Sequence, residues 1–198
     1  MKALKHVLFS ILLLGIINSA QATIILSLET SETTIDVGDS VAVDVVLSGL
    51  GDFSAVSVSS FVVEVLFDST VLNFDSESYT GLLGDIPTEA DPFTSIAPGS
   101  VTLDLLSFLF DFELDALQPE SFTLGTLNFS GLSNGVSALS FGSTELIDTD
   151  PTLPVALVPD AFQTSSVNVA STSVPEPAPV LLMLFGSIAM LMVRKKAK

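Results

Sequence analysis

Residues 40–48 read Ser-Val-Ala-Val-Asp-Val-Val-Leu-Ser, with apolar and polar side chains in a regular pattern. Apolar side chains recur at every second position from Val41 to Leu47, and Asp44 stands among the residues between them. A period of two places the alternating side chains on one face of a β-strand. The stretch therefore predicts a strand with one buried face and one face in water, as in an antiparallel sandwich.

The same periodicity extends to both sides of this strand. Between residues 24 and 170, β-branched and aromatic residues alternate with Ser, Thr and Asp, and no convincing amphipathic helix interrupts them. We predict an all-β domain, an antiparallel jelly roll or β-sandwich. The expected strands are 24–29, 40–48, 56–67, 71–74, 101–110, 122–129, 137–141 and 162–170. The expected turns are Val37-Gly38-Asp39, Gly49-Leu50-Gly51-Asp52, Ala97-Pro98-Gly99 and Ser133-Asn134-Gly135.

The expected third strand also fixes a register. Val63, Val65 and Phe67 should face the core together with Val41, Val43 and Val45, while Glu64 and Leu66 lie on the other face. The stretch 103–117 is ambiguous, because its dense Leu, Phe, Asp and Glu residues fit a strand followed by a short helical turn.

The N-terminus has the organisation of a secretory signal peptide. Two lysines precede an apolar run at 7–17, and small residues follow at Ala20 and Ala22. The run is too short for a comfortable membrane crossing, and Ala20-Gln21-Ala22 is typical of a signal peptidase site. We expect residues 1–22 to be removed by cleavage before Thr23.

The C-terminus contains a second apolar segment. Residues 180–193 carry no charge and are followed by Arg194, Lys195 and Lys196. The basic end favours a cytoplasmic position for the tail, which places residues 23–179 outside. We therefore predict a short transmembrane helix with a basic stop.

Val174-Pro175-Glu176-Pro177 stands directly before this segment. The block from Val174 to Lys198 resembles the PEP-CTERM sorting signal. The resemblance implies recognition by an exosortase, a Gram-negative host, an inner-membrane intermediate, and delivery to the cell surface or extracellular matrix. An ordinary single-pass anchor with a proline-containing stalk is the alternative.

The basic and acidic residues lie in different parts of the chain. All six Lys and Arg residues and the single histidine, His6, lie in the two terminal signals, so residues 23–193 carry the 23 acidic residues and a formal charge of −23. Such a domain repels polyanions, which excludes nucleic acid and anionic lipid as expected partners. The absence of cysteine excludes disulfides, so stability must come from the core.

The same composition excludes most catalytic designs. Without His, Cys, Lys or Arg in the exported region there is no Ser-His-Asp or Cys-His nucleophile, no Schiff-base lysine and no zinc site. A glycosidase-type carboxylate pair remains, with Glu64 and Asp68 or Asp111 and Glu113 as candidates. An acid-rich surface brings carboxylates together by chance, so we predict a non-catalytic protein.

No cofactor is expected, but calcium has to be considered because an acidic exported domain without basic residues suits a hard cation. Asp148, Asp150 and Asp160 surround one loop, but their spacing does not match the loops that wrap a single Ca²⁺ ion. Asp85, Glu89 and Asp91 belong to a second expected loop with the same shortcoming. We expect solvated acidic loops, with Ca²⁺ at Asp148 and Asp150 as the weaker alternative.

Three local patterns occur in order along the domain. They are Leu26-Ser27-Leu28 with Val37-Gly38-Asp39, then Phe61 to Phe74 with its Phe67-Asp68 turn, then Leu124 to Phe129 with Gly135 to Leu139 and Asp148-Thr149-Asp150. Together they resemble the cohesin-type domain, a nine-stranded jelly-roll sandwich of the carbohydrate-binding-module superfamily. The resemblance implies a module that binds dockerins or, in relatives, polysaccharide. This chain departs from the polysaccharide binders because it has no Trp and a single tyrosine, Tyr79.

The predicted organisation is a signal peptide at 1–22, a β-sandwich at 23–170, a linker at 171–179 and the hydrophobic, basic part of the sorting signal at 180–198. Signal peptidase and exosortase are the expected processing partners, with transient membrane insertion of the C-terminal segment. The domain itself should be a binding or adhesion module for matrix polysaccharide or another envelope protein. A structural acidic matrix component without a defined ligand is the alternative.

Overall fold

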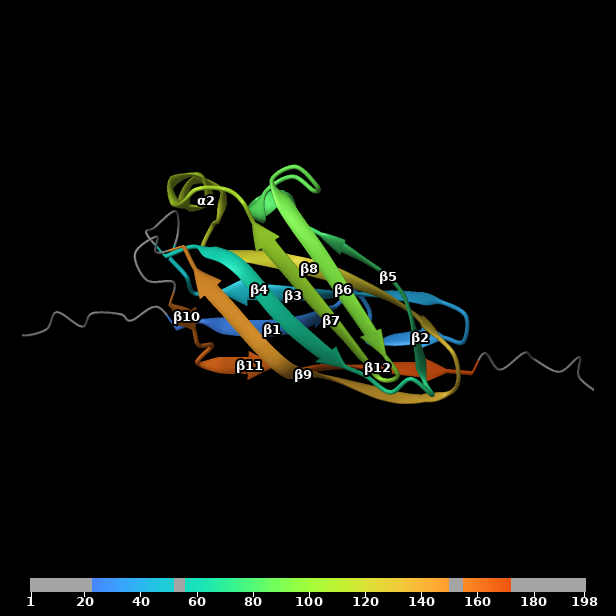
Figure 1. Cartoon of the computed structure of the whole chain (residues 1–198). Helices are drawn as coiled ribbons and strands as arrows, with labels where there is room; N and C mark the ends of the chain where they lie inside the picture. The colour runs from blue at the N-terminus through green and yellow to red at the C-terminus, as the bar shows by residue number, and fades with distance from the viewer. Residues whose placement is uncertain (1–22, 52–55, 150–154, 172–198) are drawn as a thin grey trace, which may run out of the picture.

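Two β-sheets stacked face to face form the part of the chain that the structure describes, residues 23–51, 56–149 and 155–171 of a computed structural model (Figure 1). The predicted signal peptide, the sorting block and Asp150 lie outside the described residues. Within the described ranges, no helix has the length and apolar character needed to cross a membrane.

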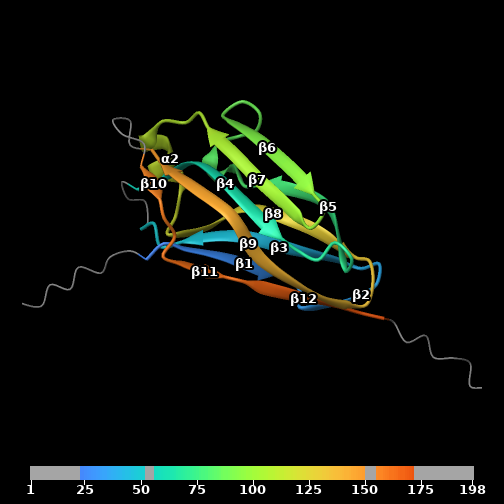
Figure 2. The ribbon, with the colours of Figure 1, turned by 60° about the horizontal axis from the view of Figure 1, so that its bottom comes forward.

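Each sheet combines strands that are distant in sequence, and an α-helix and a 3₁₀-helix close one end of the sandwich (Figures 1 and 2). The first sheet has the order β11 (Ala161–Gln163), β1 (Ile25–Thr30), β3 (Ser40–Ser48), β8 (Ser121–Gly131) and β5 (Leu72–Tyr79). The second has the order β2 (Thr34–Asp36), β12 (Ser165–Ala170), β9 (Gly135–Asp148), β4 (Val58–Leu66), β7 (Ser100–Ser107) and β6 (Ala90–Ala97), with β10 (Ala156–Leu157) paired to β9. The helices are η1 (Gly81–Leu83) and α2 (Asp111–Leu117).

The predicted faces of β3 and β4 are confirmed. The alternating residues of β3, from Val41 to Leu47, are buried, and so are Val63 and Val65 of β4. Just after β4, Phe67 is half-buried and packs edge-on against Phe129, with ring centroids 5.0 Å apart. On the opposite face of β4, Glu64 is half-buried and Leu66 is exposed, as the register requires. Because the sheets bury these faces against each other, the apolar core between them holds the fold without a disulfide.

Three of the expected turns contain a glycine with a positive φ angle, although Asp52 of one of them lies outside the described residues, whereas Gly135 of the fourth belongs to β9. Gly38 and Gly99 have φ angles of 93° and 82°, values that strain any residue with a Cβ. Gly99 lies where the chain reverses between the paired strands β6 and β7, and Gly38 lies where it passes from β2 in one sheet to β3 in the other. The ambiguous stretch resolves as strand β7 followed by α2, so the alternative of a short helical turn is confirmed.

The prediction of an entirely antiparallel sandwich is wrong at the chain ends. Instead of one strand at 162–170, the chain forms β11 in the first sheet and β12 in the second. The first strand is likewise followed by β2 in the opposite sheet. As a result β1 pairs with β11, and β2 with β12, in parallel. The alternation in the sequence does not reveal this crossover: β12 buries Val167 and Val169, whereas β11 has no fully buried residue.

A second correction concerns the acidic loop expected around Asp91. Asp91 belongs to β6, an edge strand that pairs only with β7. Its neighbour Pro92 lacks an N–H, which an edge strand tolerates because one of its sides has no partner strand. Strand β9 is also longer than expected and reaches Asp148, so this residue ends a strand.

Candidate binding surface

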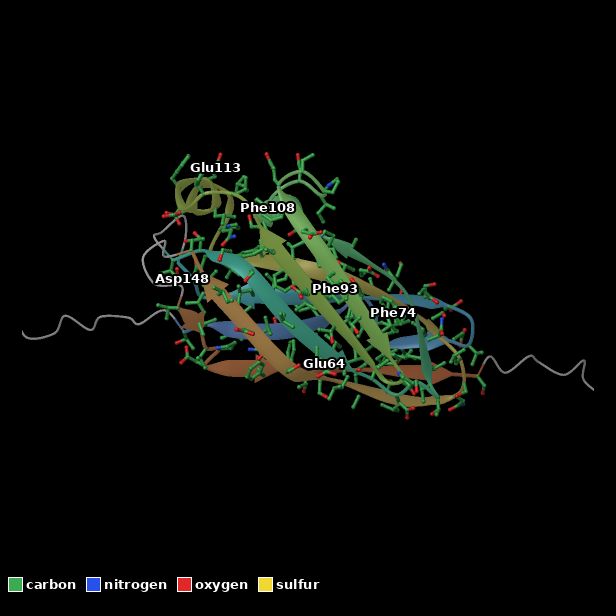
Figure 3. All side chains as sticks on the ribbon, viewed as in Figure 1. Glu64, Phe74, Phe93, Phe108, Glu113 and Asp148 are labelled. Carbon is green, nitrogen blue, oxygen red and sulfur yellow. The ribbon has the colours of Figure 1, made fainter. Side chains whose placement is uncertain are left out.

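The outer face of the sheet β9-β4-β7-β6 carries exposed apolar side chains. Phe93 on β6 lies opposite Asp104 on β7, and Leu106 on β7 lies opposite Asp91. Phe93 is 66% exposed and Leu106 49%, although both belong to regular strands. Val62 of β4 continues the row beyond Asp104. Figure 1 views this sheet from its outer side, and Figure 3 marks Phe93 and Glu64 on it.

Carboxylates alternate with these apolar groups. Glu64 accepts hydrogen bonds from the backbone N–H of Ser143 at 3.1 Å and from its hydroxyl at 3.2 Å. These bonds hold the pKa of Glu64 below its usual value. The side chain lies over Gly142 of β9, where an added Cβ would collide with the carboxylate. The glycine therefore gives Glu64 room to cross from β4 to β9.

Asp104 occupies a different environment on the same face. Burial raises its pKa, and the negative charge of Asp91 on the neighbouring strand raises it further. Because residues 23–193 contain no Lys, Arg or His, no basic side chain of the domain can relieve this repulsion. A cation supplied by a partner would do so.

Tyr79 fixes the position of β6 relative to the other sheet. Its hydroxyl lies 2.9 Å from the hydroxyl of Thr94 and donates to the carbonyl of Phe93 at 3.4 Å. Burial raises the pKa of Tyr79, so the phenol keeps its proton to a higher pH than an exposed tyrosine does. The single tyrosine of the chain thus links the edge strands β5 and β6 beside Phe93 and is half-buried.

A second apolar surface, which we call the aromatic ridge, consists of Phe108, Phe110 and Phe112. These side chains are 57%, 66% and 71% exposed. The rings of Phe110 and Phe112 stack with centroids 5.9 Å apart and an interplanar angle of 8°. The ridge begins after β7 and enters α2, at the end of the sandwich where Figure 3 labels Phe108 and Glu113.

Three of the four candidate catalytic carboxylates, Glu64, Asp68 and Glu113, accept hydrogen bonds from the backbone. Asp68 accepts hydrogen bonds from the backbone N–H of Thr70 at 2.8 Å and from its hydroxyl at 2.7 Å, which lower its pKa and brace the turn into β5. Glu113 accepts the backbone N–H of Phe110 at 2.9 Å at the start of α2. A general acid of a glycosidase needs a raised pKa, the opposite of the shift at Glu64 and Asp68.

The candidate calcium loops also have local roles. The backbone N–H of Asp148 donates to the carbonyl of Val155 at 3.1 Å, and the carboxylate of Asp160 accepts the N–H of Ile24 at 2.9 Å. Glu89 accepts the N–H of Asp85 at 3.1 Å within a turn. Across the described parts of the chain, no three acidic, His or Cys residues gather closely enough to hold a metal ion.

Sequence reasoning missed both apolar surfaces, because it took the apolar face of each predicted strand to be buried. The available signal was the spacing Leu106-Phe108-Phe110-Phe112, which continues past the last buried residue of the strand into Asp111 and Glu113. A core strand would have ended its apolar alternation where the acidic residues begin.

No protein-family model matches the chain, and no curated protein matches it. Solved structures do. The seventh ScaB type I cohesin of Pseudobacteroides cellulosolvens has a TM-score of 0.59 at 15% identity, covering 78% of this chain and 96% of the cohesin. A type II cohesin from the cellulosome of Acetivibrio cellulolyticus scores 0.58 at 16% identity, covering 74% and 95%. A type I cohesin–dockerin complex from Clostridium thermocellum scores 0.58 at 13% identity, covering 78% and 97%. The described part of the chain therefore has an all-β sandwich fold similar to that of cohesin domains.

Proposed function

We propose that this chain is a non-catalytic module that binds another protein through the outer face of β9-β4-β7-β6. The observation that carries the proposal is the row of Phe93 and Leu106, exposed on regular strands and flanked by Asp91 and Asp104. Apolar side chains on a rigid sheet supply contact area, and the surrounding carboxylates select a partner with basic groups.

The similar solved structures support a protein as the partner. Among them are complexes of type I cohesins with dockerins from Clostridium thermocellum. For this chain we propose a folded protein of the same envelope that presents basic side chains around an apolar centre. Matrix polysaccharide is less well supported, because the outer sheet face carries Phe93 in place of the Trp and Tyr platforms that stack on sugars.

The test compares two surfaces of the same protein. We expect Phe93→Ser with Leu106→Ser to weaken capture of an envelope protein by about tenfold or more, as hot-spot residues do. The matched control is Phe162→Ser with Val158→Ser, which removes side chains 47% and 76% exposed elsewhere. Chemical crosslinking followed by mass spectrometry identifies the partner and the contacted strand. If both variants capture as the wild type does, the sheet face is not the binding site. If the wild type captures nothing, a structural acidic matrix component is the better description.

We further propose export through the signal at 1–22 and sorting by an exosortase that recognises Val174-Pro175-Glu176-Pro177. The support is the order in the sequence of this motif, the short apolar segment and the basic end. Mass spectrometry of the mature protein from its native host should find residues 180–198 removed, and Glu176→Ala should retain them. Recovery of intact Lys198 from the wild type would favour a plain membrane anchor.

A further inference from the structure

We infer that the aromatic ridge is a second docking site, and that its occupant is an extended polypeptide segment that alternates basic and apolar side chains. This inference goes beyond the function of the sheet face. It rests on the exposure of Phe110 and Phe112, on their stacked geometry and on the charge around them.

The ridge is held in place before any partner arrives. The backbone N–H of Phe108 donates to the carbonyl of Glu89 at 2.7 Å, and that of Phe110 to the carboxylate of Glu113 at 2.9 Å. Leu114 of α2 is fully buried, and Ser57 donates its hydroxyl to Asp115, which joins the helix to the chain before β4. Rings held on such a frame lose little conformational freedom when a partner binds.

The rings of Phe110 and Phe112 do not belong to the apolar core. Phe110 and Phe112 are 66% and 71% exposed, whereas the phenylalanines at the centre of the sandwich, Phe61 and Phe129, are at most 1% exposed. Their stacking covers part of each ring but leaves apolar surface in water. Large exposed aromatic groups on a fixed frame are typical of contact surfaces.

Charge identifies the occupant. Asp111 and Glu113 belong to the same short helix as the rings, and the turn from Asp85 to Glu89 is joined to Phe108 by a hydrogen bond. No basic side chain occurs between residues 23 and 193 to balance these carboxylates. A Lys or Arg side chain can lie over a phenylalanine ring and face a carboxylate at once, which joins cation–π attraction to an ion pair.

The other occupants fit this charge poorly. A second copy of the chain would bring another domain of formal charge −23 against the aromatic ridge and its neighbouring carboxylates. An anionic lipid surface is repelled for the same reason. An alternating basic and apolar segment meets both the rings and the carboxylates.

The experiment uses the full chain, tethered to a biosensor in a non-ionic maltoside, and a synthetic peptide of alternating arginine and leucine as the probe. Phe110→Ser with Phe112→Ser should weaken binding by about tenfold, the loss expected for two exposed cation–π contacts. Val158→Ser is the matched control, because Val158 is 76% exposed between β10 and β11, outside both the sheet face and the aromatic ridge, and its loss should change binding by less than about twofold. Binding should weaken as salt is added, and a glutamate–leucine peptide should not bind.

Each alternative outcome overturns the inference. Equal binding by the wild type and the double variant would exclude the ridge as the site. An equal loss in Val158→Ser would show that the peptide binds exposed apolar groups without preference for the ridge, and equal binding of the glutamate–leucine peptide would exclude charge recognition. If sedimentation shows that the wild type is a dimer and the double variant a monomer, the occupant is a second copy of the chain. Should the double variant unfold, Phe112→Ser alone repeats the test at the most exposed ring.

Discussion

At the scale of single residues, Gln118 acts as a substitute strand partner. Its side-chain oxygen accepts the N–H of Val58 at 2.8 Å, and its side-chain nitrogen donates to the carbonyl of Val58 at 2.8 Å. The nitrogen also lies 3.4 Å from the carbonyl of Leu82. The amide therefore satisfies both backbone groups of the first residue of β4 and ties α2 to the sheet.

Gln118→Leu should lower the free energy of unfolding by about 2–4 kcal/mol, since it leaves two buried backbone groups of Val58 without partners. Urea denaturation of the sandwich followed by circular dichroism measures the change. Gln163→Leu is the control, because Gln163 is exposed on β11 and its replacement should shift stability by less than about 0.5 kcal/mol. Equal shifts in the two variants would show that the hydrogen bonds of Gln118 contribute nothing specific.

At the scale of elements, strands with long alternation were predictable and short terminal strands were not. Residues 40–48 form β3 as predicted, because burial on one side leaves a strict period of two in the sequence. Strand β6 was not predicted, since its outer face carries Asp91 and Phe93 and the strand contains Pro92. An edge strand with little buried surface shows almost no alternation of apolar and polar residues in its sequence.

The candidate surfaces were less predictable than the fold for a related reason. The composition gives the number of phenylalanines in the chain. Whether each ring is buried depends instead on where the fold places it. Phe61 is buried and Phe110 is exposed, although both follow serine-containing apolar stretches. Asp111 and Glu113, the acidic neighbours of Phe110, were a candidate catalytic pair, but the hydrogen bond that Glu113 accepts from the N–H of Phe110 shows a role of Glu113 in starting α2.

At the scale of the whole molecule, uncompensated negative charge should limit stability. Residues 23–193 carry a formal charge of −23, and this repulsion is present only when the chain is compact enough to bring the carboxylates together. Sodium chloride should therefore raise the thermal midpoint of unfolding, since screening shortens the range of repulsion to about 10 Å near 0.1 M salt.

Adding calcium to the same measurement distinguishes screening of the carboxylate charges from specific binding of the ion. With no metal-ligand cluster among the described residues, millimolar calcium chloride should stabilise no more than sodium chloride of equal ionic strength. Differential scanning calorimetry at matched ionic strengths makes the comparison. A flat midpoint in both salts would mean that the carboxylates are too dispersed to repel one another, and a larger effect of calcium would point to a bound ion.

The parallel pairing of β12 with β2 has a consequence for how the module is presented. Strand β12 ends at Ala170 beside Asp36, and both views place this end of the sandwich opposite α2 (Figures 1 and 2). Any attachment through the chain after Ala170 is therefore made at one end of the sandwich. The stacked rings of Phe110 and Phe112 belong to the opposite end, so a partner can approach them from the side away from Ala170.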